Sequence, residues 1–185
     1  SAACNINLKM IVFRYRLYII YFLIFFYPFY LRADTTDFVT NGFDLAEQQY
    51  ALLYKAHKDL TKYPRSGDPS GKTTFTDIRD WTGGFWPGCL WYVFEYTGDD
   101  QWRDAALKWT NSLRQNQFNT HHHDIGFVMN CSYGNAYRLT GDTTFKSILI
   151  QSAKSLLTRF NPKVGAIKSW NTFSSWDSKH KYEFP

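Results

Sequence analysis

Hydrophobic positions recur at helical spacing along most of the chain, and no segment shows convincing strand alternation. Residues 44–62 carry an apolar stripe with acids early and lysines late, as the helix macrodipole favours, and they predict a helix. Residues 85–96 and 125–139 are apolar on nearly all faces, so we expect two buried helices there. Residues 100–115 and 143–160 are amphipathic at the helical period and predict two further helices.

These four later helices form an internal repeat with an offset of 43 residues, because Tyr96-Thr97-Gly98-Asp99 matches Leu139-Thr140-Gly141-Asp142. Each unit is a buried helix, a Thr-Gly-Asp turn and an amphipathic helix. Repeated helix pairs of this length predict a helical array, either open or closed into a toroid. In a closed toroid the buried helices are the inner ones, and we expect the residues at their starts to gather at one end of the ring.

Polar segments precede both buried helices. Residues 63–84 are rich in Pro, Gly, Ser, Thr and Asp, and we expect a long loop there. Asp124 ends the second polar segment, where it could simply cap the following helix. Asp124 could instead be the chemical centre of a pocket lined by the aromatic, glycine-rich residues 81–88 and by residues 167–170, with Gly126 allowing a backbone or a ligand to come close. The spacing leaves both interpretations open.

All seven tryptophans lie between Trp81 and Trp176. An indole has a flat apolar face and a polar edge, which suits a sugar ring and a helical core equally well. For four of them we expect packing in the core or between helices: Trp86, Trp91, Trp102 and Trp109.

The net charge of +5 comes mostly from the amino-terminal segment. Residues 1–33 hold four of the 21 basic residues and no acid, so the remaining 17 basic and 16 acidic residues nearly balance. A near-neutral body without a basic stripe argues against nucleic acid as a partner. Cys4, Cys89 and Cys131 lack disulfide or metal spacing, and we expect free thiols at the two helical positions.

Residues 17–31 form an apolar run, broken only by Pro28, that follows Arg14 and Arg16. This pattern predicts a secretory signal peptide, because about 15 residues are short for a membrane span. The sequence up to Ala33 is a poor cleavage site, so an uncleaved signal anchor remains the alternative. We therefore expect residues 1–33 to direct export to the periplasm or beyond, with membrane association only through this segment if it is uncleaved.

Four motifs between about residue 44 and the end of the chain resemble the unsaturated glucuronyl hydrolases of glycoside hydrolase family 88. They occur in order: Trp81-Thr82-Gly83-Gly84-Phe85-Trp86-Pro87-Gly88, His123-Asp124-Ile125-Gly126-Phe127, Tyr137-Arg138-Leu139-Thr140-Gly141, and the stretch from Arg159-Phe160-Asn161-Pro162 to Ser169-Trp170. The resemblance implies an all-α fold, namely the amino-terminal helix pairs of an incomplete (α/α)6 toroid. The unsaturated rhamnogalacturonyl hydrolases share that fold, but the motif around Asp124 favours the glucuronyl branch.

The resemblance also implies a reaction. Enzymes of this family release 4,5-unsaturated glucuronic acid from the non-reducing end of lyase-generated, glycosaminoglycan-type oligosaccharides. They hydrate the C4=C5 double bond and need no metal or cofactor. Asp124 maps onto one of their two catalytic aspartates. The same resemblance implies that the substrate is contacted by His123, Trp81, Phe85 and Trp170. The alternative for the three aromatic residues is packing in the core, and the alternative for the histidine is an ordinary loop position. We expect His121 and His122 to be surface residues.

The second aspartate of the family follows a Phe-Pro pair, and this sequence ends at Phe184-Pro185. The resemblance therefore implies that residues 34–185 are the amino-terminal part of the hydrolase domain, truncated before the second Asp. We expect such a fragment to be inactive by itself. An inactive carbohydrate-binding fragment is the alternative from another functional class. A helical scaffold for protein partners is disfavoured, because aromatic residues and glycines cluster at loops.

Overall fold

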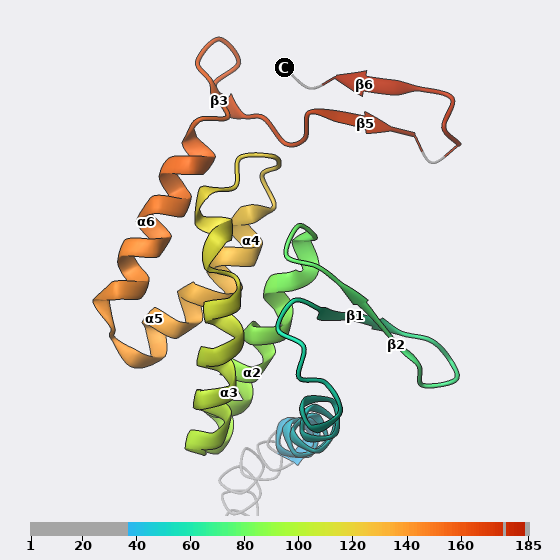
Figure 1. Ribbon diagram of the computed structural model, residues 1–185, viewed down its shortest axis with the longest axis vertical. Helices are drawn as coiled ribbons and strands as arrows, with labels where there is room; N and C mark the ends of the chain where they lie inside the picture. The colour runs from blue at the N-terminus through green and yellow to red at the C-terminus, as the bar shows by residue number, and fades with distance from the viewer. Residues whose placement is uncertain (1–36, 176, 184–185) are drawn as a thin grey trace, which may run out of the picture. The chain divides into compact units, whose positions relative to one another are not determined.

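The computed structural model describes residues 37–175 and 177–183 (Figure 1). The segment that we expect to direct export, residues 1–33, lies outside them. The chain divides into two compact units, Ser1–Gln49 and Tyr50–Pro185. In the first unit, residues 37–49 are described and are helical. Among the described residues, no helix has both the length and the apolar character needed to cross a membrane.

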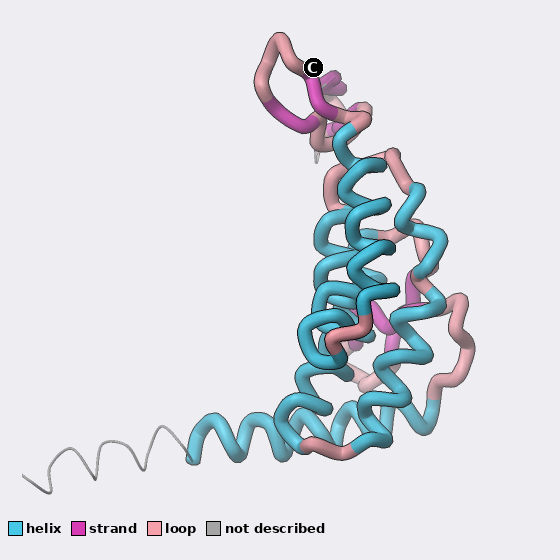
Figure 2. The backbone as a smooth tube through the Cα atoms, turned by 90° about the vertical axis from the view of Figure 1, so that its left-hand side faces the viewer, coloured by secondary structure: helices cyan, strands magenta, loops and turns pink. Residues whose placement is uncertain are grey.

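The second unit is mainly helical, and its strands form short hairpins (Figure 2). It begins with helical residues 50–56. The elements that follow are β1 (Tyr63–Gly67), β2 (Thr73–Thr76), η1 (Trp81–Gly84), α2 (Phe85–Thr97), α3 (Asp100–Ser112), η2 (Arg114–Phe118), α4 (Ile125–Met129), η3 (Asn130–Gly134), α5 (Asn135–Thr140), α6 (Thr143–Leu157), β3 (Phe160–Asn161), β4 (Ala166–Ile167), β5 (Thr172–Ser174) and β6 (Lys181–Glu183). The strands pair antiparallel as β1–β2, β3–β4 and β5–β6.

The four helices of the predicted repeat are all present as α2, α3, the run α4–η3–α5, and α6. Two expectations outside the repeat were wrong. The first predicted helix ends at residue 56 rather than 62. The expected long loop before α2 contains the β1–β2 hairpin. Tyr63 anchors this hairpin, because its ring is fully buried edge-on against Trp109 and its hydroxyl is 2.8 Å from Ser112 Oγ on α3.

The repeat is reproduced at atomic detail in its two Thr-Gly-Asp turns. Gly98 and Gly141 end α2 and α5 with φ angles of 69° and 70°, in the left-handed region that glycine tolerates best. Asp99 and Asp142 then cap α3 and α6, each accepting a hydrogen bond of 2.8 Å from the backbone N–H two residues later. The turn chemistry thus explains why both units break at the same place.

The two inner helices approach each other backbone to backbone. A Cβ atom added to Gly84, just before α2, would lie 2.5 Å from the Cα of Val128 in α4. At Gly88, one turn further on, an added Cβ would lie 3.0 Å from the carbonyl oxygen of Cys131. These glycines let the start of α2 lie directly against α4 and η3, which brings the loops before the two helices together.

The outer helices cover this inner pair. Helix α3 runs beside α2, and α6 packs against α4 and η3 (Figure 1). Trp91, Trp102 and Trp109 fill the core and are almost inaccessible, as the sequence predicts. The indole Nε1 of Trp91 donates to Thr110 Oγ1 at 2.9 Å, so the polar edge of this buried ring is satisfied.

Candidate active site

Asp124 lies at the start of α4, yet its side chain does not cap the helix. Its backbone is already helical, with φ −65° and ψ −9°, and its carbonyl oxygen accepts from the N–H groups of Phe127 and Val128. The carboxylate is 8% exposed and is turned toward other partners. Helix capping therefore does not account for this side chain.

Three ring nitrogens face the Asp124 carboxylate. Trp170 Nε1 donates to Oδ2 at 3.0 Å, and His123 Nε2 lies 3.2 Å from Oδ1. His122 Nδ1 lies 3.7 Å from Oδ2. The expectation that His122 is a surface residue was wrong, because its side chain is only 16% exposed. His121 is exposed, as expected.

Trp170 lies beside Asp124 because Arg159 holds two segments together by hydrogen bonds to their backbone: the loop before α4 and the segment after β4. The guanidinium and Nε of Arg159 donate to the carbonyl oxygens of Lys168 at 2.8 Å, Thr120 at 2.5 Å and Ser169 at 3.2 Å. The N–H of His123 also donates to the carbonyl of Ser169, at 2.9 Å. The segment after β4 is thereby tied to the loop before α4, a role of Arg159 that its position in the sequence does not indicate.

The indole of Trp170 also packs against His123. Their ring centroids are 4.9 Å apart at an interplanar angle of 77°. One face of the site thus consists of the carboxylate, an imidazole and an indole held at fixed relative positions.

A second face of the site is aromatic. Trp81 in η1 meets Phe85 edge-on at 5.5 Å between centroids, and Trp81 lies 6.4 Å from Phe127 in α4. All three rings are between 39% and 54% exposed, so they are not core residues. Phe127 follows Asp124 by three residues and connects the aromatic face to the carboxylate through the first turn of α4. Its place in the apolar run after Asp124 was the sequence signal for this role.

Asp80 fixes the aromatic face by capping η1. Its Oδ1 accepts from the backbone N–H of Thr82 at 2.9 Å and from the Thr82 hydroxyl at 2.6 Å, and its Oδ2 lies 3.5 Å from the guanidinium of Arg65. Burial alone would raise the pKa of Asp80, but these hydrogen bonds and Arg65 outweigh it, so the pKa is lowered. Asp80 is therefore held as a carboxylate at the start of the segment that carries Trp81.

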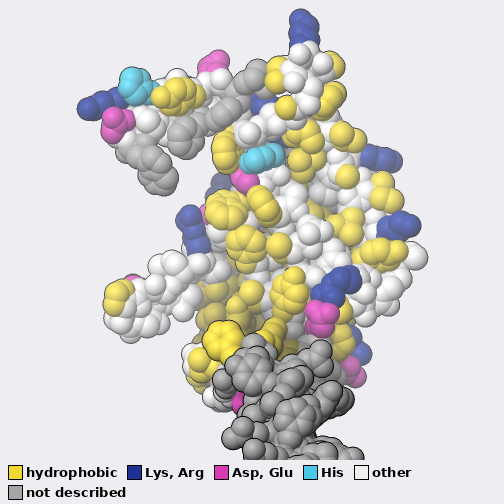
Figure 3. Space-filling model, turned by 180° about the vertical axis from the view of Figure 1, so that it is seen from behind, with side chains coloured by type: hydrophobic (Ala, Val, Ile, Leu, Met, Phe, Trp, Pro, Cys, Tyr) yellow, Lys and Arg dark blue, Asp and Glu magenta, His cyan; other side chains and the backbone are white. Residues whose placement is uncertain are grey.

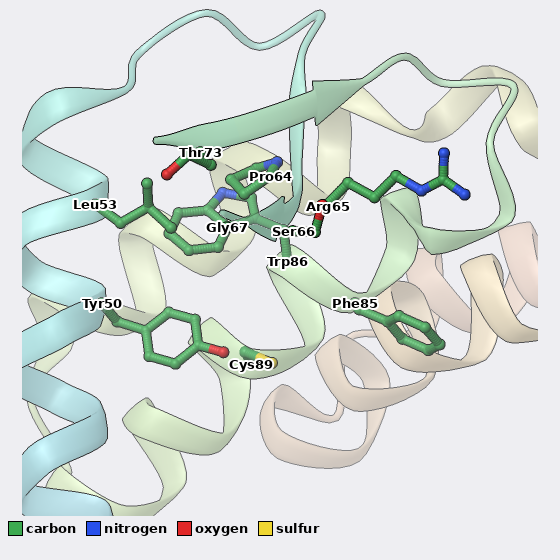
Figure 4. Close-up of a pocket in the computed structure, with 10 residues that line it drawn as sticks. All are labelled: Tyr50, Leu53, Pro64, Arg65, Ser66, Gly67, Thr73, Phe85, Trp86 and Cys89. Atoms are coloured by element: carbon green, nitrogen blue, oxygen red, sulfur yellow. The ribbon is translucent and has the colours of Figure 1, made fainter. Parts of the chain in front are cut away.

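A cavity of about 280 Å³ lies beside the aromatic face (Figure 4). Its lining comes from helical residues 50–56, the β1–β2 hairpin and the first turn of α2: Tyr50, Leu53, Pro64, Arg65, Ser66, Gly67, Thr73, Phe85, Trp86 and Cys89. Phe85 borders this cavity and also touches Trp81. Burial, together with a hydrogen bond to Cys89, raises the pKa of the Tyr50 hydroxyl, so this group stays neutral. This cavity is not lined by Asp124 or Trp170, so it is not the pocket that the sequence predicts around Asp124.

The structure therefore brings together the five candidate residues, Asp124, His123, Trp170, Trp81 and Phe85, through direct contacts and through Phe127. In the view of Figure 3, a histidine and an acidic side chain lie among exposed hydrophobic side chains. Within the described ranges, no group of three or more His, Cys, Asp or Glu side chains is placed to hold a metal ion. Cys89 and Cys131 are free and partly buried.

Comparisons with known proteins show which family the chain resembles. No family model matches the chain. A curated unsaturated glucuronyl hydrolase of Formosa agariphila is 33% identical over 147 residues, which are 75% of this chain and 36% of that protein. One from Bacillus sp. strain GL1 is 36% identical over 112 residues, or 59% of this chain and 30% of that protein. The chain thus spans about a third of the length of these relatives.

The fold agrees as well. The crystal structure of an unsaturated glucuronyl hydrolase specific for heparin matches with a TM-score of 0.69 at 40% identity, over 76% of this chain and 37% of that one. Such structures are α/α toroids, so the prediction of an all-α fold that corresponds to part of a toroid is confirmed.

Proposed function

This chain belongs to the unsaturated glucuronyl hydrolase family, and from that premise we propose that its protein releases 4,5-unsaturated glucuronic acid from the non-reducing end of lyase-generated oligosaccharides. The reaction hydrates the C4=C5 double bond. A proton adds to C4 of the enol ether, and water adds to C5. The resulting hemiketal opens and frees the neighbouring sugar.

Asp124 is one of the two carboxylates that this chemistry takes. Proton transfer needs a positioned acid or base within hydrogen-bond reach of the reacting atoms. Asp124 is nearly buried, is unused by its helix, and is oriented by the indole N–H of Trp170. That combination is the single observation that carries the proposal, because a carboxylate with a purely structural role would be expected to cap α4.

The half-exposed rings of Trp81, Phe85 and Trp170 are the sugar-binding surfaces in this proposal. Flat aromatic faces suit the apolar faces of pyranose rings. His123 lies beside Asp124, at 38% side-chain exposure, and contacts a hydroxyl or the carboxylate of the substrate. One relative is described as specific for heparin, and we place the substrate of this protein among the glycosaminoglycan-type oligosaccharides.

The full-length protein tests the proposal directly. Unsaturated disaccharides produced by lyases from heparin and from chondroitin are offered separately, and the loss of ultraviolet absorbance of the conjugated double bond is followed. We expect turnover of at least one of them by the wild type and none by Asp124→Asn. Equal rates for the two proteins would refute the role of Asp124. Turnover only of an unsaturated rhamnogalacturonan disaccharide would support the related branch instead.

Assays on the purified 185-residue chain distinguish catalysis from substrate binding. We propose that this chain turns over no substrate by itself, because it spans only about a third of the length of its relatives. Full-length-like rates from the purified chain would contradict this. Saturable binding of the unsaturated disaccharide without turnover would favour the hypothesis that the chain is an inactive carbohydrate-binding fragment.

A further inference from the structure

His122 has a buried nitrogen that lacks a hydrogen-bond partner among the described residues. Its Nδ1 atom is inaccessible to solvent and lies 3.7 Å from Oδ2 of Asp124. Buried polar groups are nearly always hydrogen-bonded, so an isolated one calls for an explanation. A distance of 3.7 Å is too long for a hydrogen bond, but the nitrogen faces a carboxylate oxygen that has room for a second donor.

The other contacts of Asp124 indicate which of its carboxylate oxygens would accept a hydrogen bond from His122 Nδ1. Oδ2 already accepts from Trp170 Nε1 at 3.0 Å, while Oδ1 lies beside the more exposed His123. The mostly buried His122 therefore lies on the Oδ2 side of the carboxylate, and the more exposed His123 lies on the Oδ1 side. A second donor on Oδ2 would fix the plane of the carboxylate and would leave Oδ1 with its His123 neighbour unchanged.

We propose that His122 is a positioning residue for Asp124, an inference that rests on the proposed function. When the site closes on substrate, Nδ1–H of His122 donates to Oδ2 of Asp124. Hydrogen bonds at catalytic groups are often long in the empty site and shorten in the complex, and the gap to be closed here is small. The proposal requires the Nδ1–H tautomer or the imidazolium, because the Nε2–H tautomer would present a lone pair to the carboxylate.

Two substitutions in the full-length enzyme test the kinetic consequence. His122→Leu keeps the approximate bulk and removes the donor, and we expect kcat to fall roughly 10- to 100-fold while KM changes less than about twofold. His122→Asn places an amide N–H near the position of Nδ1, and we expect it to recover most of kcat. His121→Leu is the matched control, because His121 is the exposed neighbour in the same run, and its kinetics should equal those of the wild type.

An unchanged kcat in His122→Leu would overturn the inference and leave the role of Asp124 intact. So would a His122→Asn variant as slow as His122→Leu, since a merely structural role is not rescued by one donor atom. A second measurement needs no turnover. Nitrogen-15 chemical shifts of the labelled enzyme should show His122 with a proton on Nδ1, and Asp124→Ala should shift that resonance. An Nε2–H tautomer, unchanged in Asp124→Ala, would overturn the inference even if the proposed reaction were wrong.

Discussion

The indole Nε1 of Trp170 lies 3.0 Å from Oδ2 of Asp124, although the two residues are 46 positions apart in the chain. Trp170 follows the β3–β4 hairpin, and Asp124 precedes the inner helix run that begins with α4. The hydrogen bond therefore joins two parts of the unit that share no secondary structure. It is held in place by Arg159, whose donors bind carbonyl oxygens on both sides. The same indole packs edge-on against His123.

Trp170→Phe should separate the hydrogen bond from the ring contact. The phenyl ring keeps an aromatic surface beside His123 but has no N–H for Asp124. Because preorganised donors at a reacting group commonly contribute tenfold or more, we expect kcat to fall roughly tenfold with little change in KM. Trp170→Ala removes both features and should also raise KM. If the Phe and Ala variants are kinetically alike, the hydrogen bond has no separate role.

Asp124→Asn should lower kcat strongly without unfolding the protein. General acid–base groups contribute roughly 10²- to 10⁴-fold, so we expect kcat to fall by about that factor. Since the side chain makes no cap and is nearly buried, we expect the free energy of unfolding to be equal to that of the wild type or higher. Urea denaturation and steady-state kinetics on the same preparation measure both.

The matched control is Asp99, which does cap a helix, α3. Asp99→Ala should lower the free energy of unfolding by about 1 kcal/mol and leave kcat unchanged. A clear loss of stability in Asp124→Asn would contradict the conclusion that Asp124 has no structural role. A loss of kcat in Asp99→Ala would contradict the conclusion that Asp99 only caps α3.

Helical periodicity was sufficient to predict the repeat, because α2, α3, α5 and α6 break at Thr-Gly-Asp turns whose chemistry is local. Gly98 must adopt a positive φ, and Asp99 caps the helix that follows. The repeat also sets Glu95 and Arg138, which occupy equivalent positions in the two units, as a bidentate ion pair between α2 and α5. The two local signals therefore located the ends of the inner helices and the starts of the outer ones correctly.

Features that depend on contacts between residues far apart in the chain could not be predicted from the sequence. The β1–β2 hairpin depends on the burial of Tyr63 against α3, which no local pattern around residues 63–76 reveals. His122 lies among polar neighbours, so its burial follows from the fold of the loop and not from its sequence. The π-helical turn η3 likewise depends on side chains that satisfy displaced carbonyl groups, such as Asn135 Nδ2 donating to Cys131 at 2.9 Å.

Acidification should loosen the segment that carries Trp81. The pKa of Asp80 is lowered in the folded protein, so its carboxylate contributes stability above its unfolded pKa of about 3.9, and that contribution is lost as the pH falls through the lower, folded value. Asp80→Asn should therefore be less stable than the wild type at pH 7, and the difference should shrink in strong acid. Denaturant midpoints measured across this pH range give both quantities.

Thr82→Val serves as the intermediate case, because it removes the hydroxyl that donates to Asp80 at 2.6 Å and keeps the carboxylate. Its loss of stability on acidification should lie between those of the wild type and Asp80→Asn. An identical pH dependence in all three proteins would mean that Asp80 does not stabilise η1.

Gly84 and Gly126 should respond in opposite ways to the same added methyl group. At Gly84 the new Cβ would lie 2.5 Å from the Cα and 2.6 Å from the carbonyl oxygen of Val128, and neither backbone atom can move without shifting α4. We expect Gly84→Ala to lower the free energy of unfolding by roughly 1–3 kcal/mol or more. At Gly126 no heavy atom lies within 4 Å of the added Cβ, so Gly126→Ala should gain about 0.5–1 kcal/mol of helix stability.

The open space at Gly126 matters because this residue is two positions after Asp124, in the first turn of α4. Apart from α4 itself, no part of the described chain lies within 4 Å of a Cβ at Gly126, and we predict that the substrate approaches Asp124 over this side. We therefore expect Gly126→Ala to raise KM several-fold while the protein becomes no less stable. Urea denaturation followed by tryptophan fluorescence, together with kinetics on the unsaturated disaccharide, distinguishes the two glycines. An unchanged KM in Gly126→Ala would mean that the substrate does not approach Asp124 over this side of α4.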